Sequence, residues 1–281
     1  MSDAAERHRQ QIEAWNGPMG QQWAANEART ERNLTEVTQA LLRAANPQPG
    51  ESVLDIGCGC GGSSVAFATA VGPTGHVLGA DVSAPMVAVA QATALPQAAF
   101  VLADAASYDF APAHFDLLVS RFGVMFFGDP GAAFANLRRA MKPGGRVAMA
   151  CWRPMTENPW VRVPMGTLRA MLPAMPPPAG PEDPGPFAFG DPGRVTRILT
   201  EGGFSAPAFT KFDFDMVFPA DPAAAANVIM QMGPAGRIMR EQTEEVRGAA
   251  LKAIADAIAP FQKDGRIAMG GAIWLITATA G

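Results

Sequence analysis

The segment "SVLDIGCGCGGSS", residues 52–64, constrains the fold more than any other part of this chain. A short apolar run ends at Gly57, and Gly59 and Gly62 complete the spacing G-x-G-x-x-G before a helical stretch. Small residues at such a bend let a ligand approach bare backbone, and the start of a helix presents unpaired N–H groups. The segment therefore predicts a buried strand, a ligand-binding turn and a helix.

Strand-like and helix-like stretches continue to alternate after this turn. A helix is expected over residues 35–45 and another over 63–71. Apolar runs follow at "HVLGADV", "AFVLAD", "FDLLVS" and "KPGGRVAMACW", with helical stretches such as "SAPMVAVAQATAL" and "DPGAAFANLRRAM" between them. Strand and helix alternate five times, which predicts a Rossmann-like α/β fold: a doubly wound parallel sheet with helices on both faces.

The chain after residue 152 is less regular. Residues 153–190 are rich in proline, which predicts an excursion that is neither helix nor strand, and their methionines and phenylalanines predict a packed apolar flap. Beyond the flap we expect a helix at 195–200, a strand in "FTKFDFDMVF", an amphipathic helix around 251–261 and a final strand at "GAIWLITATA". The expected division is an N-terminal lid segment (1–34), a ligand-binding core (35–152), the flap (153–190) and a C-terminal part of the sheet with cap helices (191–281).

Composition narrows the range of partners and compartments. The net charge is -4 and charged residues make up 17% of the chain, so nucleic acid is not an expected partner. No apolar run reaches the roughly 20 residues of a membrane span, and the polar start lacks a secretory h-region, so we expect a cytoplasmic protein. Cys58, Cys60 and Cys151 have no second pair at zinc spacing, so no metal is expected. Nothing in the sequence predicts the oligomeric state.

Two acids suggest which ligand the turn binds. Asp81 ends the second predicted strand, 20 residues after Gly61, where a carboxylate can accept hydrogen bonds from both hydroxyls of a ribose. Asp55 lies two residues before Gly57 and would repel a pyrophosphate but attract an ammonium or sulfonium group. The only tyrosine, Tyr108, has no lysine four residues on, so no oxidoreductase apparatus is visible. These residues favour a cationic, adenosine-containing cofactor.

The motifs "VLDIGCGCG", "GADVS", "LADAASYDF", "FDLLVS" and "LRRAMKPGGRVAMACW" resemble, in order and spacing, those of class I S-adenosylmethionine-dependent methyltransferases. The branch that looks most similar is that of the ubiquinone/menaquinone-type and other small-molecule methyltransferases. The resemblance covers about residues 35–152 strongly. It implies a seven-stranded sheet whose last strand is antiparallel, and S-adenosylmethionine as the cofactor.

The resemblance also implies roles for individual residues. The methionine part of the cofactor would lie among Asp55, Gly57, Cys58, Gly59 and Gly61. Asp81 would hold the ribose, Val82 and Met86 would flank the adenine, Asp104 and Ala105 would meet the adenine edge, and Ser120 would lie beneath the sulfonium. The alternatives are a structural turn for the glycines, capping for the acids and core packing for Met86.

The acceptor pocket is expected at the carboxyl ends of the fourth and fifth strands. The candidates there are Arg121, Phe122, Trp152 and Arg153, joined by Trp15 and Trp23 if the N-terminus acts as a lid. Arg121 would orient an anionic substrate group or form a salt bridge with Asp129, and the two interpretations weigh equally. The tryptophans could equally be core residues.

No catalytic base is predicted. Methyl transfer mainly requires alignment of nucleophile, methyl and sulfur, so a general base is optional. His76 and His114 precede strands and should lie at the surface away from the ligand crevice, and His8 is expected to be solvated. "NPW" at residues 158–160 follows the fifth strand rather than the fourth, so we do not assign it to the N-P-P-Y type motif of N-methyltransferases.

The function predicted from the sequence is transfer of a methyl group from S-adenosylmethionine to a small, largely hydrophobic acceptor. The apolar, methionine-rich segments after residue 152 suggest that acceptor, because such side chains line adaptable apolar pockets. The alternatives are an NAD-dependent oxidoreductase on the same half-fold and a non-catalytic S-adenosylmethionine-binding protein.

Overall fold

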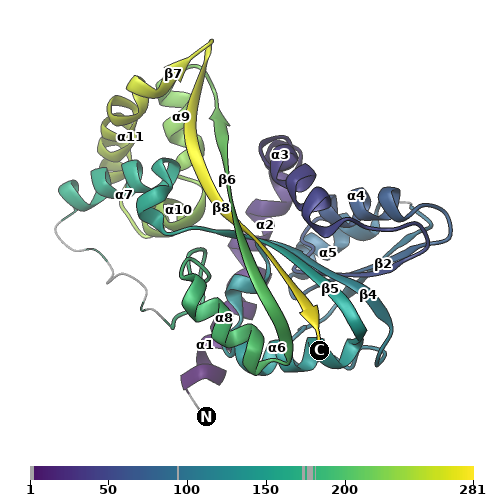
Figure 1. Ribbon diagram of the computed structural model, residues 1–281. Helices are drawn as coiled ribbons and strands as arrows, with labels where there is room; N and C mark the ends of the chain where they lie inside the picture. Colours follow the sequence, from purple (N-terminus) through teal and green to yellow (C-terminus); the bar gives the residue numbers. More distant parts are fainter. Residues whose placement is uncertain (1–2, 94, 173–174, 176–179, 181) are drawn as a thin grey trace. The chain divides into compact units, whose positions relative to one another are not determined.

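The computed structural model describes residues 3–93, 95–172, 175, 180 and 182–281, and its chain forms two compact units (Figure 1). The first unit comprises Met1–Trp152, Pro181–Phe212 and Ile273–Gly281. The second comprises Arg153–Gly180 and Asp213–Ala272. The division falls directly after the fifth strand and again within two later strands, β6 and β8.

The first unit carries the strand and helix alternation that the sequence predicts. Its strands are β1 (Ser52–Ile56), β2 (His76–Asp81), β3 (Ala98–Leu102), β4 (Phe115–Arg121), β5 (Met141–Trp152) and parts of β6 (Phe204–Phe218) and β8 (Arg266–Ala280). Its helices are α1 (Asp3–Asn16), α2 (Pro18–Ala25), α3 (Glu27–Ala45), α4 (Gly62–Val71), α5 (Ala84–Gln91), η1 (Val124–Phe126), α6 (Pro130–Ala140) and α8 (Pro192–Glu201).

The sheet follows the order β3-β2-β1-β4-β5-β8-β6, with the short β7 (Gln262–Lys263) paired to β8. Strands β1 to β5 pair in parallel, and β8 runs antiparallel to β5. This confirms the Rossmann-like sheet with an antiparallel last strand. The order reverses between β1 and β4, and in such sheets ligands bind at this switch point, outside the carboxyl ends of the strands.

The core of the first unit lies on both faces of the central strands. Val53 and Leu54 in β1 and Leu117, Leu118 and Val119 in β4 are 0% exposed, as expected of parallel strands covered on both sides. Figure 1 shows α3 and α4 over one face of the sheet and α6 and α8 over the other. Asp129 caps α6 by accepting a hydrogen bond from the N–H of Ala132 at 3.0 Å.

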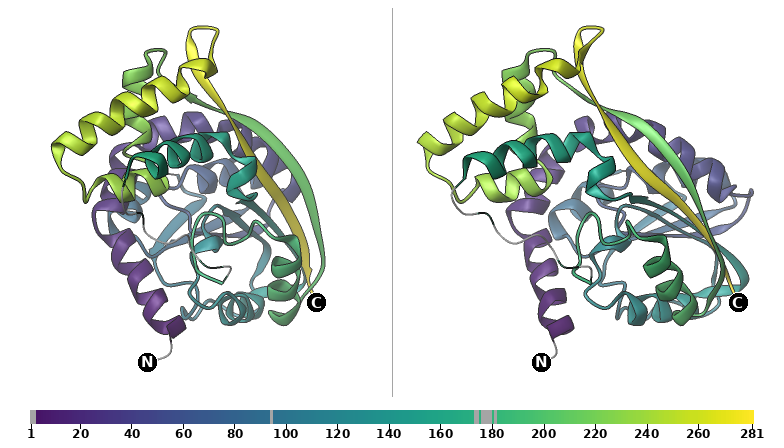
Figure 2. Two further views of the ribbon diagram at one scale, coloured as in Figure 1. Left: turned by 90° about the vertical axis from the view of Figure 1, so that its left-hand side faces the viewer. Right: turned by 60° about the vertical axis from the view of Figure 1, so that its left-hand side comes forward.

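Residues 3–34 are almost entirely helical, and the expected start of a helix at residue 35 is wrong by eight residues. Helix α3 begins at Glu27 and runs to Ala45, after α1 and α2. Figure 2 shows these three helices in purple, one after another, before the chain enters β1. The sequence pattern did not indicate the first two turns of α3, because they are polar. Only the residues from Leu34 onward form a clear apolar stripe.

The second unit is mainly helical. It holds η2 (Met155–Glu157), α7 (Pro159–Met171), α9 (Pro222–Ile229), α10 (Gly233–Met239), α11 (Glu244–Ile258), η3 (Ala259–Phe261), β7 and the remaining parts of β6 and β8. Ile254 and Ile258 are buried along α11, as the amphipathic pattern predicts, while Leu251 is only half-buried.

The prediction that residues 153–190 form neither helix nor strand is wrong for α7. Pro159 occupies the first helical turn, where its missing N–H costs no hydrogen bond. Trp160, Pro164 and Leu168 follow at intervals of four and are buried, so α7 is an amphipathic helix despite an internal proline. The most proline-rich stretch, "PAMPPPAGP" at 173–181, lies mostly outside the described residues. None of the helices in the described part of the chain could cross a membrane.

Candidate active site

The glycine turn is built by close backbone packing as well as by its own flexibility. Gly57 has φ of +67°, a left-handed conformation that glycine adopts without strain. A Cβ added to Gly57 would overlap the Cα of Gly123, which follows β4, and a Cβ on Gly123 would overlap Gly57 in turn. These two glycines therefore join the ends of β1 and β4 by direct backbone contact.

The other two glycines of the turn face different neighbours. Gly61 has φ of +89°, and a Cβ there would lie 2.9 Å from the ring of Phe100. Gly59 has φ of +55°, and the nearest atom to its added Cβ is the Sδ of Met86 at 3.7 Å. Of the three, Gly59 alone leaves room for an additional group, and it lies beside Met86.

Asp81 ties the turn to the end of β2. Its Oδ2 accepts a hydrogen bond from the N–H of Gly59 at 2.8 Å, and its Oδ1 accepts one from the N–H of Ser83 at 2.8 Å. The residue is 8% exposed, and burial raises the pKa of its carboxyl, a shift that these backbone hydrogen bonds partly offset. Each carboxylate oxygen retains a lone pair for a further donor.

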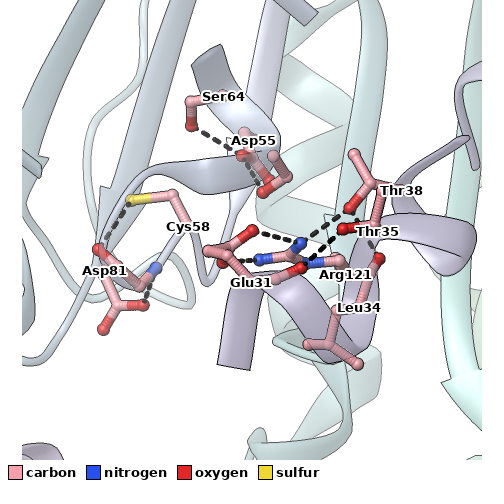
Figure 3. A network of polar contacts seen from close by, with 11 residues as sticks. Glu31, Leu34, Thr35, Thr38, Asp55, Cys58, Ser64, Asp81 and Arg121 are labelled. Atoms are coloured by element: carbon pink, nitrogen blue, oxygen red, sulfur yellow. Dashed lines mark hydrogen bonds and ion pairs between the residues drawn. The ribbon is translucent and has the colours of Figure 1, made fainter. Parts of the chain in front are cut away.

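Asp55 is fully buried at the end of β1. Its Oδ2 accepts hydrogen bonds from the hydroxyls of Ser63 at 2.7 Å and Ser64 at 2.6 Å, at the start of α4 (Figure 3). Its Oδ1 has no hydrogen-bond partner among the described residues. Burial raises the pKa of this carboxyl, and the two hydroxyls oppose that shift.

Asp104 follows β3 and is bound by an N-terminal histidine. The Nε2 of His8 lies 2.8 Å from Oδ2 of Asp104, and the Nδ1 of His8 accepts a hydrogen bond from the N–H of Gly128 at 3.4 Å. Because Nδ1 is the acceptor in this arrangement, Nε2 is the ring nitrogen that bears the hydrogen and donates a hydrogen bond to Asp104. The expectation that His8 is solvated is therefore wrong, because helix α1 packs at the carboxyl edge of the sheet. His76 and His114 are exposed, as predicted.

The last residues of α1 contact the segment that follows β2. Asn16 donates to the carbonyl of Val82 at 2.7 Å, and its Oδ1 accepts from the N–H of Ala84 at 3.0 Å. Ser83 donates its hydroxyl to the carbonyl of Trp15 at 2.6 Å. These bonds bring the N-terminal helices to the residues expected to flank the adenine.

Two tryptophans of the N-terminal helices belong to an aromatic cluster. The ring of Trp15 meets that of Trp23 edge to face, with centroids 5.9 Å apart, and meets Phe126 in the same way at 5.2 Å. Phe126 belongs to η1, just after β4. Trp23 therefore packs within a cluster that reaches the carboxyl end of β4.

Arg121, at the end of β4, is held by helix α3. Its Nη1 donates to Glu31 at 2.8 Å and to Thr38 at 2.7 Å, and its Nη2 donates to the other carboxylate oxygen of Glu31 (Figure 3). The predicted alternative of a salt bridge between Arg121 and Asp129 is therefore wrong, because Arg121 pairs with Glu31 of α3 instead.

The residues after β4 form a strained bend. The hydroxyl of Ser120 accepts hydrogen bonds from the N–H groups of Gly123 at 3.1 Å and Val124 at 3.2 Å. Phe122 has φ of +68°, which for a bulky residue costs about 1–2 kcal/mol. Its ring stacks on Trp152 with centroids 4.5 Å apart and planes 9° apart. Strain of this kind concentrates at functional sites.

The cysteines do not behave as reactive thiols. Burial raises the pKa of Cys58 well above its ordinary value, and burial with nearby Glu27 and Glu31 raises that of Cys60 to about 12. Cys151 is also buried, and its pKa is raised by that burial. All three therefore remain protonated at neutral pH and serve as small apolar side chains.

Sequence reasoning missed Glu31, His8, Asn16 and Gly123. A signal for Glu31 was present, because it precedes the buried Leu34 and Thr38 by three and seven residues and so lies on the inner face of α3. Nothing local identified His8, whose partner lies 96 residues away.

The sequence of this chain is similar to those of known methyltransferases. A methyltransferase domain model matches residues 53–145. Nocamycin O-methyltransferase of Saccharothrix syringae is 31% identical over 231 residues, which cover 77% of this chain and 80% of that protein. The ubiquinone/menaquinone biosynthesis C-methyltransferase UbiE of Burkholderia vietnamiensis is 37% identical over 123 residues, covering 41% of this chain and 51% of that protein.

Solved structures share the fold. Phosphoethanolamine N-methyltransferase 2 of Haemonchus contortus, in complex with S-adenosyl-L-methionine, superposes with a TM-score of 0.52 at 18% identity, covering 87% of this chain and 52% of that chain. The YcgJ protein of Bacillus subtilis gives a TM-score of 0.55 at 18% identity, covering 87% of this chain and 98% of that chain.

This chain belongs to the class I S-adenosylmethionine-dependent methyltransferases. It is an enzyme whose cofactor is S-adenosylmethionine. The residues at the carboxyl edge fit that cofactor on two counts: the open space beside Gly59, and the Oδ1 of Asp55, which has no partner among the described residues. This class and cofactor replace the alternatives of an NAD-dependent oxidoreductase and a non-catalytic binding protein.

Proposed function

We propose that this methyltransferase acts on a small, largely hydrophobic acceptor at the carboxyl edge of the first unit. The observation that carries the proposal is the stacked pair of Phe122 and Trp152, 8% and 7% exposed, at the ends of β4 and β5. A stacked, nearly dry aromatic surface suits an apolar ring or chain, and the strained Phe122 backbone fixes its orientation. The nocamycin and ubiquinone/menaquinone enzymes are named for small-molecule acceptors.

The cofactor would be held by the residues that meet at the same edge. We assign Gly59 to the close approach of the backbone, Asp81 to the ribose, Val82 and Met86 to the adenine faces, and Asp104 and Ala105 to the adenine edge. Gly57 and Gly61 shape the turn, since other residues fill the space beside them. We also propose that α1 and α2 form a lid, supported by the bonds of His8, Trp15 and Asn16 to this edge.

S-adenosylmethionine supplies an already activated methyl group, so the protein's task is alignment and exclusion of water. Asp81 and the turn would fix the donor, and the pair of Phe122 and Trp152 would orient the acceptor. The buried acids Asp55 and Asp81 favour a cationic ligand over a pyrophosphate, because like charges repel strongly where water is scarce. No side chain is assigned as a general base.

The test is transfer of label from S-adenosylmethionine into a metabolite extract. The enzyme is incubated with the extract and methyl-labelled cofactor, and the products are separated into macromolecules, polar metabolites and organic-soluble metabolites. The proposal predicts label in a small organic-soluble compound. Label confined to protein, nucleic acid or strongly polar metabolites would overturn the assignment of the acceptor.

A further inference from the structure

An ion pair beside the glycine turn is left without a role by the proposed function. Arg121 holds Glu31 with both ends of its guanidinium, in the two-pronged geometry typical of tight carboxylate recognition (Figure 3). Thr38 accepts a further hydrogen bond from Arg121 at 2.7 Å. The side chain of Arg121 is only 8% exposed, whereas that of Glu31 is 27% exposed. The carboxylate is therefore the accessible half of the pair.

The carboxylate of Glu31 lies against the glycine turn, where the cofactor is proposed to bind. A Cβ added to Gly62, the first residue of α4, would overlap that carboxylate. The charge of Glu31 also contributes to the raised pKa of Cys60, within the turn. Glu31 belongs to α3, so the contact between its carboxylate and Gly62 depends on the position of that helix.

This pair is better explained as a binding element than as a source of stability. Ion pairs removed from water contribute little net stability, because desolvation offsets their attraction. The two carboxylate oxygens of Glu31 accept two hydrogen bonds from Arg121, and a carboxylate has about four acceptor positions. Nearby, the Oδ1 of Asp55 is buried without a partner among the described residues. The turn thus offers spare acceptors and an excess of negative charge.

We propose that Glu31 accepts a hydrogen bond from the α-ammonium group of S-adenosylmethionine, and that Arg121 is a positioning residue that holds this carboxylate in place through its two hydrogen bonds. The inference rests on the proposed placement of the methionine end of the cofactor at the turn. An ammonium group suits Glu31 because its donors need a charged acceptor that is partly exposed. Arg121 is too buried to meet the cofactor carboxylate directly.

The experiment measures by calorimetry the affinity of three ligands for the full chain. S-adenosylhomocysteine carries the amino-acid end, its deamino analogue lacks only the ammonium, and methylthioadenosine lacks the whole amino-acid end. Glu31→Gln is expected to weaken S-adenosylhomocysteine at least tenfold and to leave the other two within about twofold. Equal weakening of all three ligands, or unchanged binding of S-adenosylhomocysteine, would overturn the proposal.

Two further variants keep the test decisive if Glu31→Gln folds poorly. Gly62→Ala adds a methyl group that displaces the Glu31 carboxylate, so it should produce the same selective loss. Arg121→Lys retains the charge but not the fork, so it should weaken S-adenosylhomocysteine to a lesser degree and spare methylthioadenosine. Loss of methylthioadenosine binding in both variants would contradict the role of the pair.

A matched control comes from another pair in the first unit. Arg146 donates to both oxygens of Glu51 at 2.8 Å each, the same two-pronged arrangement. Glu51→Gln should leave all three affinities unchanged. Asp81→Asn tests the placement of the cofactor separately, because it should weaken all three ligands. If Asp81→Asn has no effect, the placement is wrong, whereas a failure confined to Glu31→Gln counts against Glu31 alone.

Discussion

Gly57 and Gly59 are both glycines with a left-handed backbone, yet they have different structural roles. The space beside Gly57 is filled by Gly123, and the space beside Gly59 is open except for the sulfur of Met86. A G-x-G pattern cannot distinguish these cases, because the difference arises from a residue 66 positions further along the chain. The first glycine lets two strands meet and the second leaves room for a ligand.

Gly57→Ala should therefore destabilise the fold more than its backbone conformation alone requires. Left-handed strain and overpacking together predict a loss of about 2–5 kcal/mol in the free energy of unfolding. Gly265→Ala is the matched control, since Gly265 also has a positive φ, +73°, in the two-residue turn between β7 and β8, but nothing lies within 4 Å of its added Cβ. It should lose only about 1–2 kcal/mol. Equal losses in denaturant unfolding would contradict the packing of Gly57 against Gly123.

Asp55 should impose a pH dependence on stability. Burial raises its pKa above the ordinary value of 3.8, so between 3.8 and the raised value the folded chain binds more protons than the unfolded chain. Stability from this residue therefore falls as pH rises through that window, and is regained on acidification.

Asp55→Asn removes this titration while keeping the shape. The free energy of unfolding of the variant, relative to the wild type, should therefore increase as pH rises across the same window. The charge of Asp55 also contributes to the raised pKa of Asp81, so its removal lowers the pKa of Asp81 and changes the difference in the same direction. Denaturant unfolding at several pH values provides the measurement. A difference that stays constant with pH, or that decreases as pH rises, would show that Asp55 does not titrate as its burial requires.

At the scale of elements, the segment "NPW" at residues 158–160 forms the start of α7, with Asn158 immediately before the first helical residue. Asn158 is 0% exposed, and its amide donates to the carbonyls of Arg153, Pro154 and Ala272. Its Oδ1 accepts from the N–H of Ala272 at 2.8 Å and from the indole of Trp160 at 3.2 Å. The NH₂ group and the oxygen of this amide thus both join chain segments of the second unit, which argues against a role of "NPW" in methyl transfer.

Asn158→Ala should accordingly reduce stability and leave cofactor binding intact. Several buried backbone groups would lose their partner, and each such loss costs about 1–3 kcal/mol. Thermal unfolding should therefore shift to lower temperature, while calorimetry below the transition should give wild-type affinity for S-adenosylhomocysteine. Loss of that affinity without loss of stability would instead place Asn158 in the cofactor site.

At the scale of the whole molecule, the sequence predicts what depends on local pattern. The strands β1 to β5 and the helices between them appear where apolar runs and helix signals alternate, because each element forms from neighbouring residues. The site residues on the strand ends follow from that order. Helix α7 was missed because proline was read as a breaker throughout 153–190, although Pro159 lies at a helix start.

Contacts between distant residues could not be predicted in the same way. His8 meets Asp104 across 96 positions and Glu31 meets Arg121 across 90. Such pairs depend on where α1 to α3 settle against the sheet, and no periodicity within those helices specifies their partners. The carboxyl edge was predicted from the strands and a lid was expected from residues 1–34, whereas the contacts that hold α1 to α3 against this edge emerge only from the fold.

The most direct test of the account is a calorimetric titration of S-adenosylhomocysteine into the wild type and Asp81→Asn. Asp81 holds the turn through Gly59 and is proposed to hold the ribose, so one ligand should bind per wild-type chain. Loss of a charged hydrogen-bond partner worth about 1.5–3 kcal/mol should weaken the variant roughly ten- to a hundredfold. Equal affinity in the two proteins would contradict the assignment of the cofactor to this edge of the sheet.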